Sequence, residues 1–320
     1  MKIGFHASHE QFTPRDLLSW VPKAEKAGFQ LVLSSDHFHP WSNSQGESGF
    51  AWSWLGAAMQ ASNLEFGVVN APGQRYHPAI IAQAVATLDQ MFPGRFWMAS
   101  GSGQALNENI TGEKWPAKED RNSRLQESVQ VMRDLWKGDY ITHHGRVHVE
   151  KAKLFTKPTQ TPFIYGAALT EKTAEWISSW ADGMITVSKP LEELEKMVQA
   201  FRRRGDQGKP MALKVQISYA PSEEDALTGA WEQWKNNIFP SKLISEINTA
   251  EQFDALGASV RKEDIRKHVI IGTEASVFID KIKAFEKMGF EKIIIHNVNR
   301  EQEGFIEFFG REVLPAFKQQ

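Results

Sequence analysis

Short apolar segments alternate with amphipathic helical segments along the whole of this 320-residue chain. Residues 31–34 read Leu-Val-Leu-Ser and residues 293–295 are three isoleucines, which is typical of parallel strands buried on both faces. Between such segments the apolar residues recur at the helical period, as they do over residues 78–91. Parallel strands joined by helices restrict the chain to two fold classes, the (β/α)8 barrel and the doubly wound sheet.

Eight segments have the character of buried strands. They are residues 3–5, 31–34, 64–69, 95–99, 163–166, 183–186, 213–217 and 293–295. Eight such repeats predict an α/β fold of the (β/α)8 TIM barrel type. The doubly wound alternative requires a glycine-rich turn after the first strand, where the chain reads Phe-His-Ala-Ser instead. We therefore predict one barrel domain over residues 1–320, with a hairpin at about 139–150 and an insertion over the barrel mouth at about 221–268.

Composition excludes several classes of function. The 37 basic and 39 acidic residues give a net charge of −2, which provides no long-range attraction to nucleic acid or anionic membrane. No stretch approaches the ~20 apolar residues that a membrane span needs. The chain has no cysteine, which excludes disulfide scaffolds, cysteine nucleophiles and zinc–thiolate sites and is consistent with a cytoplasmic location. We expect an enzyme with a small-molecule substrate and no nucleic-acid or membrane partner.

Residues that follow the predicted strands are the candidates for chemistry, because barrel enzymes place their active sites at the carboxyl ends of strands. His37 is the best acid–base candidate, since an imidazole titrates at ~6.5 and the adjacent Asp36 would raise that pKa. The alternative is an Asp–His pair that only caps a strand. His6 and His9 are spaced so that both imidazoles cannot share one strand face, which does not favour a catalytic metal. A metal-dependent hydrolase nevertheless stays as an alternative function.

Two turns rich in small residues follow the fourth and fifth predicted strands. Residues 101–103 read Gly-Ser-Gly, and residues 166–168 read Gly-Ala-Ala with Thr170 at a helix start. Neither turn is a dinucleotide fingerprint or a Walker loop. Missing side chains allow a flat ring or a phosphate to approach the backbone. The turns therefore favour an anionic planar cofactor across the barrel mouth, with plain strand-to-helix turns as the alternative.

Three motifs together resemble the luciferase-like flavin and deazaflavin oxidoreductases. They are residues 35–41 (Ser-Asp-His-Phe-His-Pro-Trp), residues 75–83 (Arg-Tyr-His-Pro-Ala-Ile-Ile-Ala-Gln) and residues 101–108 (Gly-Ser-Gly-Gln-Ala-Leu-Asn-Glu), and residues 7–12 (Ala-Ser-His-Glu-Gln-Phe) extend the match. The likeness covers nearly the whole chain and is nearest to the branch of coenzyme F420-dependent glucose-6-phosphate dehydrogenases. It implies a luciferase-like barrel that transfers a hydride to or from a flavin-type ring and forms a homodimer.

The resemblance also implies roles for individual residues. His37 corresponds to the residue beside the reactive face of the ring, with Asp36 next to it, and Trp41 and Lys189 correspond to substrate-binding residues. Val69-Asn70 falls where the family has a non-prolyl cis peptide behind the ring. The positions implied to bind the cofactor ring or its phosphate are Asp36, Val69, Asn70, Ser102, Gly103, Asn107, Gly166, Ala167 and Ala168.

The chain departs from the dehydrogenase branch at Gln104, which replaces a glutamate proposed as proton donor. An amide has no titratable proton, so Gln104 joins His37 and Asp36 at the catalytic centre as an orienting group. Ala255 and His268 replace two cations expected to bind a sugar phosphate, which disfavours glucose 6-phosphate as the substrate. These departures favour a sister branch that uses FMN, with coenzyme F420 as the alternative cofactor. An FMNH2-dependent monooxygenase and a cofactor-binding protein without turnover are alternative functions.

Overall fold

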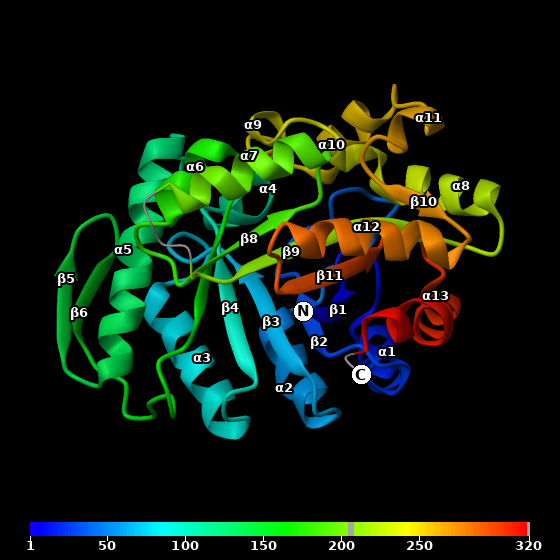
Figure 1. The fold of residues 1–320 in the computed structure, drawn as a ribbon. Helices are drawn as coiled ribbons and strands as arrows, with labels where there is room; N and C mark the ends of the chain where they lie inside the picture. The colour runs from blue at the N-terminus through cyan, green and yellow to red at the C-terminus, as the bar shows by residue number, and fades with distance from the viewer. Residues whose placement is uncertain (204–207, 319–320) are drawn as a thin grey trace.

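Eight parallel strands close into a barrel in the computed structural model, which describes residues 1–203 and 208–318 (Figure 1). In the order in which they pair around the barrel, these strands are β1 (Lys2–Ala7), β2 (Leu31–Ser34), β3 (Glu65–Asn70), β4 (Phe96–Ser100), β7 (Ile164–Ala167), β8 (Gly183–Val187), β9 (Met211–Tyr219) and β11 (Lys292–Asn297). The ring closes because β9 pairs with both β8 and β11, and β10 (Ile270–Gly272) extends from the far half of β9. The predicted (β/α)8 barrel is confirmed.

Helices connect the strands and cover the outside of the barrel. They are α1 (Pro14–Ala27), α2 (Ala51–Gln60), α3 (Pro78–Met91), α5 (Lys118–Lys137), α6 (Glu171–Ile177), α7 (Leu191–Arg202), α12 (Ala275–Lys287) and α13 (Gln302–Phe308). Local sequence signals set their ends. At α1, the Thr13 hydroxyl accepts a hydrogen bond from the Asp16 amide, and Gly28 ends the helix with a φ of 106° that favours glycine. No helix in the described ranges is both long and apolar enough to cross a membrane.

The strands present two separate apolar surfaces, because successive side chains point to opposite faces. The outward set, which includes Val32, Phe66 and Met98, packs against the helices. The inward set fills the barrel interior and consists of Leu31, Leu33, Trp97, Ala99, Tyr165, Ile185, Ala212 and Ile294. This inward apolar cluster occupies the interior of the barrel, and polar side chains gather toward the carboxyl ends of the strands.

The remaining elements lie in the long connections. After α5, β5 (Ile141–His144) and β6 (His148–Ala152) form an antiparallel pair, and His143 Nε2 lies 3.1 Å from Glu127 Oε2 on α5. The segment between β9 and β10 contains α8 (Glu223–Trp234), η2 (Lys235–Asn237), α9 (Ser241–Ile244), α10 (Ala250–Gly257) and α11 (Lys262–Ile265). The other short elements are α4 (Ala105–Glu108), η1 (Asn109–Thr111), η3 (Phe309–Val313) and η4 (Leu314–Phe317).

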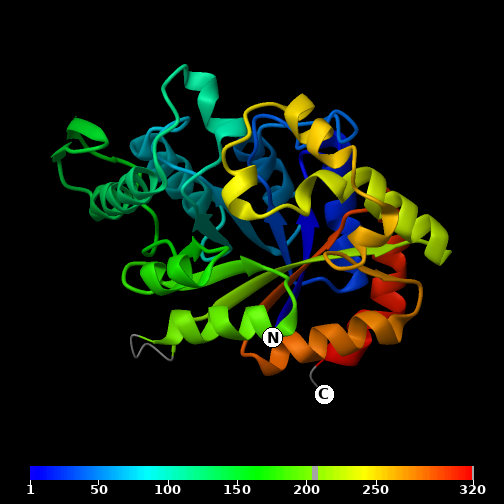
Figure 2. The same ribbon diagram turned by 90° about the horizontal axis from the view of Figure 1, so that it is seen from above.

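The segment between β9 and β10 covers one side of the barrel mouth (Figures 1 and 2). Its α9 and α10 lie on the same side of the strands as α4, which follows β4 (Figure 1). Apolar contacts among Leu106 of α4, Ile244 and Phe253 hold it there. The Ala105 amide also donates to the Ser245 carbonyl at 3.0 Å. The covering segment therefore packs directly on the turn that follows β4.

Candidate active site

A cavity of about 1630 Å³ opens at the carboxyl ends of the barrel strands. Residues in or just after β1, β2, β3, β4, β7, β8 and β9 line it, and Trp234, Phe239 and Ile244 line it from the covering segment. Small-molecule pockets typically occupy about 300–1,000 Å³. The cavity therefore has room for a cofactor and a substrate together.

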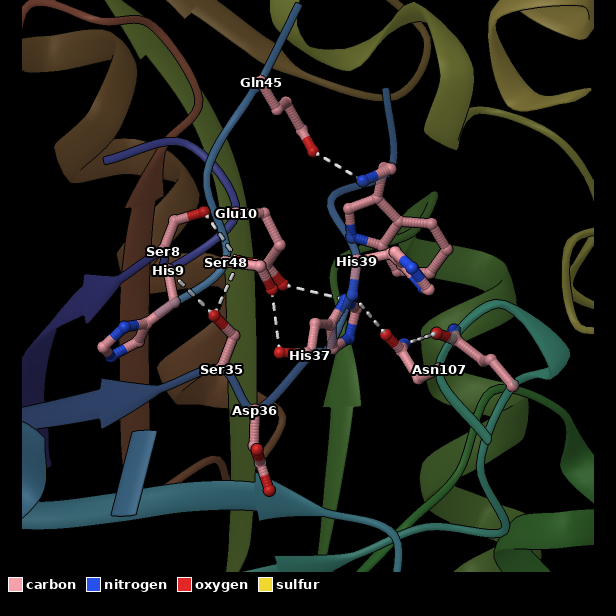
Figure 3. Close-up of polar contacts among 12 residues, drawn as sticks. Ser8, His9, Glu10, Ser35, Asp36, His37, His39, Gln45, Ser48 and Asn107 are labelled. Carbon is pink, nitrogen blue, oxygen red and sulfur yellow. Dashed lines mark hydrogen bonds and ion pairs between the residues drawn. The ribbon is translucent and has the colours of Figure 1, made fainter. Parts of the chain in front are cut away.

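His37 faces this cavity and is paired with a carboxylate from a different strand end. Its Nδ1 lies 3.1 Å from Oε1 of Glu10, which follows β1 (Figure 3). This distance suits an ion pair, although the two groups are not aligned as a hydrogen bond. The second carboxylate oxygen of Glu10 accepts hydrogen bonds from the hydroxyls of Ser8 at 3.0 Å and Ser35 at 2.6 Å. Glu10 is thus fixed behind the imidazole.

The environment favours an ionised Glu10 beside a neutral His37. Burial alone would raise the pKa of Glu10, but His37, the Ser35 hydroxyl and Lys214 outweigh it and hold that pKa below its usual value. Burial also lowers the pKa of His37, and the charges of Arg75 and Lys214 lower it further, against the opposing effect of Glu10. The carboxylate favours the proton on Nδ1, so Nε2 presents a lone pair. In the described part of the chain Nε2 has no hydrogen-bond partner. His37 can therefore accept a proton at Nε2.

Asp36 does raise the pKa of His37, as expected, but burial and the charges of Arg75 and Lys214 outweigh this effect. The pKa of His37 is lowered, and the side chain of Asp36 points away from the imidazole (Figure 3). Its carboxylate accepts hydrogen bonds from Asn70 Nδ2 at 2.8 Å and from the Tyr76 hydroxyl at 3.0 Å. Trp52 Nε1 donates a further hydrogen bond at 3.2 Å. Asp36 therefore ties the ends of β2 and β3 together, and Glu10 is the partner of the imidazole.

Arg75 lies between two buried carboxylates. One of its guanidinium nitrogens is 3.5 Å from Asp36 Oδ1, and another is 3.6 Å from Glu108 Oε1. The Arg75 amide also donates to Glu108 Oε2 at 2.8 Å. Burial raises the pKa of Glu108, and the Arg75 charge opposes that rise. This carboxylate–arginine–carboxylate group supports the loops that follow β2, β3 and β4.

The loop that carries His37 is held by Asn107 of α4. Asn107 Oδ1 accepts hydrogen bonds from the amides of Phe38 at 2.8 Å and His39 at 3.1 Å. The same loop presents Trp41, whose ring centroid lies 5.0 Å from that of His37. Asn107 Nδ2 donates to Gln104 Oε1 at 3.5 Å, and Gln104 lines the cavity. The rings of His37 and Trp41 are therefore close together, Gln104 lines the same cavity, and Asn107 holds the His37 loop, while its contact with a cofactor stays a prediction.

The two small-residue turns lie side by side at the cavity, because they follow the paired strands β4 and β7. A Cβ atom added at Gly101 would lie 3.5 Å from Cβ of Ala167, and Gly103 has a φ of 79° that favours glycine. The hydroxyl of Ser102 accepts a hydrogen bond from Lys118 Nζ at 2.6 Å. Ser102, Gly103, Ala167 and Ala168 all line the cavity.

Gly166 does not take part in this arrangement. A Cβ atom there would lie 2.7 Å from Ile177, so Gly166 allows α6 to pack closely on β7. A glycine is required at position 166 for helix packing. From the sequence alone, this requirement looks the same as a contact with a cofactor.

Residues 1–292 match a family model described as luciferase-like monooxygenase. The chain belongs to the luciferase-like monooxygenase family. Curated relatives include an F420-dependent glucose-6-phosphate dehydrogenase of Segniliparus rotundus, 32% identical over 330 residues with 99% of this chain and 98% of that protein covered. The enzyme of the same description from Mycolicibacterium smegmatis is 31% identical over 331 residues, with 99% and 98% covered.

Solved structures agree with this family assignment. An F420-dependent secondary alcohol dehydrogenase in complex with an F420-acetone adduct superimposes with a TM-score of 0.91 at 30% identity, covering 99% of each chain. A coenzyme F420-dependent tetrahydromethanopterin reductase of Methanopyrus kandleri, at 20% identity and a TM-score of 0.80 with 99% of each chain covered, shares the fold. The predicted luciferase-like family and the predicted enzyme class, an oxidoreductase, are confirmed. The family favours this class over the metal-dependent hydrolase that the sequence had left open.

Two implications of the luciferase-like resemblance differ from the structure. All peptide bonds within residues 1–203 and 208–318 are trans, including the one between Val69 and Asn70, although both residues line the cavity. The positions read as missing cations also need revision. His268 lines the rim of the cavity, but Arg266 and Lys267 beside it line that rim as well, and Lys189 does so from the end of β8. Cations other than the two replaced ones therefore lie at this rim, where Lys189 pairs with Glu193 and Arg266 with Glu223, and a phosphorylated substrate stays open.

Sequence reasoning missed Glu10 and Lys214 as site residues. Glu10 lies in the motif of residues 7–12 and follows the end of a predicted strand. This position could have identified it as a candidate site residue. Lys214 lies in the middle of β9 and lines the cavity. The alternation of Lys214 and Gln216 with the apolar residues Leu213, Val215 and Ile217 was the corresponding signal there.

Proposed function

We propose that this luciferase-like chain catalyses hydride transfer between a flavin-type cofactor and a small alcohol or carbonyl compound. The Glu10–His37 pair, facing a cavity of about 1630 Å³, is the observation that carries the proposal. Coenzyme F420 is the first candidate cofactor, because relatives at 30–32% identity are described as F420-dependent. FMN, which the sequence analysis placed first, becomes the alternative. The homodimer and the cytoplasmic location stay predictions.

The residues present suit a flat ring with polar edges. Gly101 and Ala167 lie side by side on one wall of the cavity, and their small size allows a ring to approach the backbone there. Asn70 lines the cavity, and in the described part of the chain its buried Oδ1 has no hydrogen-bond partner. A ring N–H donor would satisfy that oxygen, whose burial otherwise costs free energy.

A bound flavin-type ring supplies the acceptor or donor of the hydride. The chain supplies the proton chemistry. In the oxidation of an alcohol, such a ring would receive the hydride of the C–H bond, and His37 Nε2 would accept the O–H proton. The Glu10 carboxylate stabilises the imidazolium that results, and Gln104 orients the substrate oxygen without exchanging a proton. Trp41 forms an aromatic wall beside the imidazole.

The direct test loads the purified protein separately with coenzyme F420 and with FMN and records the visible spectrum of the bound cofactor. Without oxygen, a panel of alcohols and sugar phosphates, glucose 6-phosphate included, is expected to contain compounds that bleach the bound cofactor. Oxygen consumption with reduced FMN tests the alternative monooxygenase function. Failure of the protein to retain either cofactor would contradict the proposal.

Ala167→Glu is expected to weaken cofactor binding by at least tenfold more than Ala167→Gln does. Both substitutions add a side chain of similar size to the turn of residues 166–168, where the family resemblance implies the cofactor phosphate, but only glutamate adds a negative charge there. Like-charge contacts cost several kcal/mol at a desolvated interface. Equilibrium dialysis with F420 and FMN measures the effect. Equal losses in the two variants would place the phosphate elsewhere.

The pH dependence of kcat/KM is expected to show one limiting ionisation, in His37. Activity requires the neutral imidazole, so it rises with pH through the His37 pKa, which lies below its ordinary value of ~6.5. The acidic limb should therefore lie below that pH. Gln104→Glu should add a second ionisation whose pKa burial raises. A wild-type profile with two well-separated limbs would show that another acid, such as Glu108, takes part.

A further inference from the structure

Lys214 is a charged side chain inside the barrel that the proposed proton transfer does not use. On β9, side chains point alternately outward and inward. Leu213 and Val215 belong to the outward core under the helices, whereas Ala212 belongs to the inward apolar cluster. Lys214 and Gln216 continue the inward row and line the cavity. The ammonium therefore lies on the cavity wall, near the apolar interior of the barrel.

The immediate neighbours of Lys214 carry no negative charge. Its Nζ lies 5.8 Å from the centroid of the Trp234 ring. The rings of His6 and His296 lie 4.4 Å apart, and burial, followed by the charge of Lys214, lowers the pKa of both well below the usual value. Both histidines are therefore neutral.

Glu10 is the carboxylate that acts on Lys214, and it is already engaged elsewhere. Its oxygens contact the Ser8 and Ser35 hydroxyls and His37 Nδ1. Across residues 1–203 and 208–318, Lys214 Nζ donates no hydrogen bond and makes no ion pair within 4.0 Å. The Lys214 side chain is partly exposed and lines the cavity, and its ammonium has three donors. An anion bound in the cavity can therefore pair with this ammonium without displacing a protein partner.

We propose that Lys214 forms an anion subsite of the cavity, and that the substrate is a small hydroxy or oxo acid whose carboxylate pairs with this ammonium. The proposal rests on the proposed function and names its substrate class. Lys214 and His37 both line this cavity, and the charge of Lys214 lowers the pKa of His37. A hydroxy acid places its carboxylate at Lys214 and its hydroxyl at His37 Nε2. The aromatic ring of Trp234 provides an apolar surface beside the carboxylate.

The test compares 4-fluorobenzoate with 4-fluorobenzamide, which have similar shapes but differ in charge. Fluorine NMR titrations of the full chain, without cofactor and then loaded with F420 or FMN, give the two dissociation constants. We expect the carboxylate to bind at least about tenfold more tightly than the amide, as one charge-assisted hydrogen bond allows. Lys214→Met should remove this preference. Lys281→Met, which removes an exposed lysine of α12 that also lines the cavity, should retain it.

Three outcomes would overturn the assignment: equal binding of the two probes to the wild-type chain, a carboxylate preference that survives in Lys214→Met, or displacement of the carboxylate by the cofactor. The last result would show that Lys214 serves the cofactor. Lys214→Gln provides a second variant where the methionine variant does not fold, as judged by circular dichroism. Failure of the proposed function is seen separately, as loss of cofactor binding in the wild-type protein.

Discussion

Replacing His37 by alanine is expected to lower kcat by about 100- to 10,000-fold, which is the range for loss of a general acid–base group. Cofactor binding should be kept, because the imidazole contacts Glu10 and faces Trp41 and does not hold the fold of the turns around the ring. Single-turnover reduction of the bound cofactor, with a substrate found in the alcohol panel, measures the effect on the chemical step. A loss of less than about threefold would reassign His37 as a structural residue.

Glu10→Gln is the matched variant, since it keeps the size of the side chain and removes its charge. The Glu10 carboxylate raises the pKa of His37 against the effect of burial, so its removal should lower that pKa further. The acidic limb of the kcat/KM profile should then move to lower pH, together with a loss of kcat. If the acidic limb of the kcat/KM profile stays at the same pH in Glu10→Gln, a group other than Glu10 sets the pKa that limits activity.

Arg75→Met is expected to destabilise the native state by about 3–5 kcal/mol, because it leaves two buried carboxylates without their cation. The side chains of Arg75, Asp36 and Glu108 are 6%, 1% and 2% exposed, so water cannot replace the guanidinium. Urea unfolding at neutral pH gives the change in free energy of unfolding. Arg203→Met provides the control, because its ion pair with Glu175 is exposed and such pairs contribute at most about 1 kcal/mol.

The destabilisation caused by Arg75→Met should also depend on pH, with a sign that follows from Glu108. Burial already raises the pKa of Glu108 in the native state, and removal of the arginine charge raises it further. A group with a raised native pKa binds its proton more tightly in the folded than in the unfolded chain. The deficit should therefore be largest at neutral pH and shrink as the pH falls below the raised pKa. A deficit that is constant with pH would point to lost packing instead.

The sequence predicted the strands and the ends at which chemistry occurs, because apolar runs and helical periods are local properties. His37, Trp41 and Gln104 were found because each follows a strand end. The partner of His37 was not found, because Asp36 is adjacent in the chain but points to the other side, and Glu10 comes from the neighbouring strand. Which side chains meet across strands depends on register and loop geometry. Gly166 illustrates the same limit, since its small size serves the packing of α6.

The two sides of the His37 loop are anchored to different parts of the molecule. The His37 side chain pairs with Glu10, and Asn107 accepts hydrogen bonds from the amides of Phe38 and His39 in the same loop. Trp41 is tied to the segment between β9 and β10, through the Phe253 ring at 5.2 Å and through Gln45, which accepts from the Trp41 amide and donates to the Gln233 carbonyl. Changes in that segment therefore act directly on the substrate wall, whereas the Glu10–His37 ion pair joins the loops that follow β1 and β2. Divergence within the family can accordingly exchange substrates by remodelling one peripheral segment, at little risk to an inherited catalytic core.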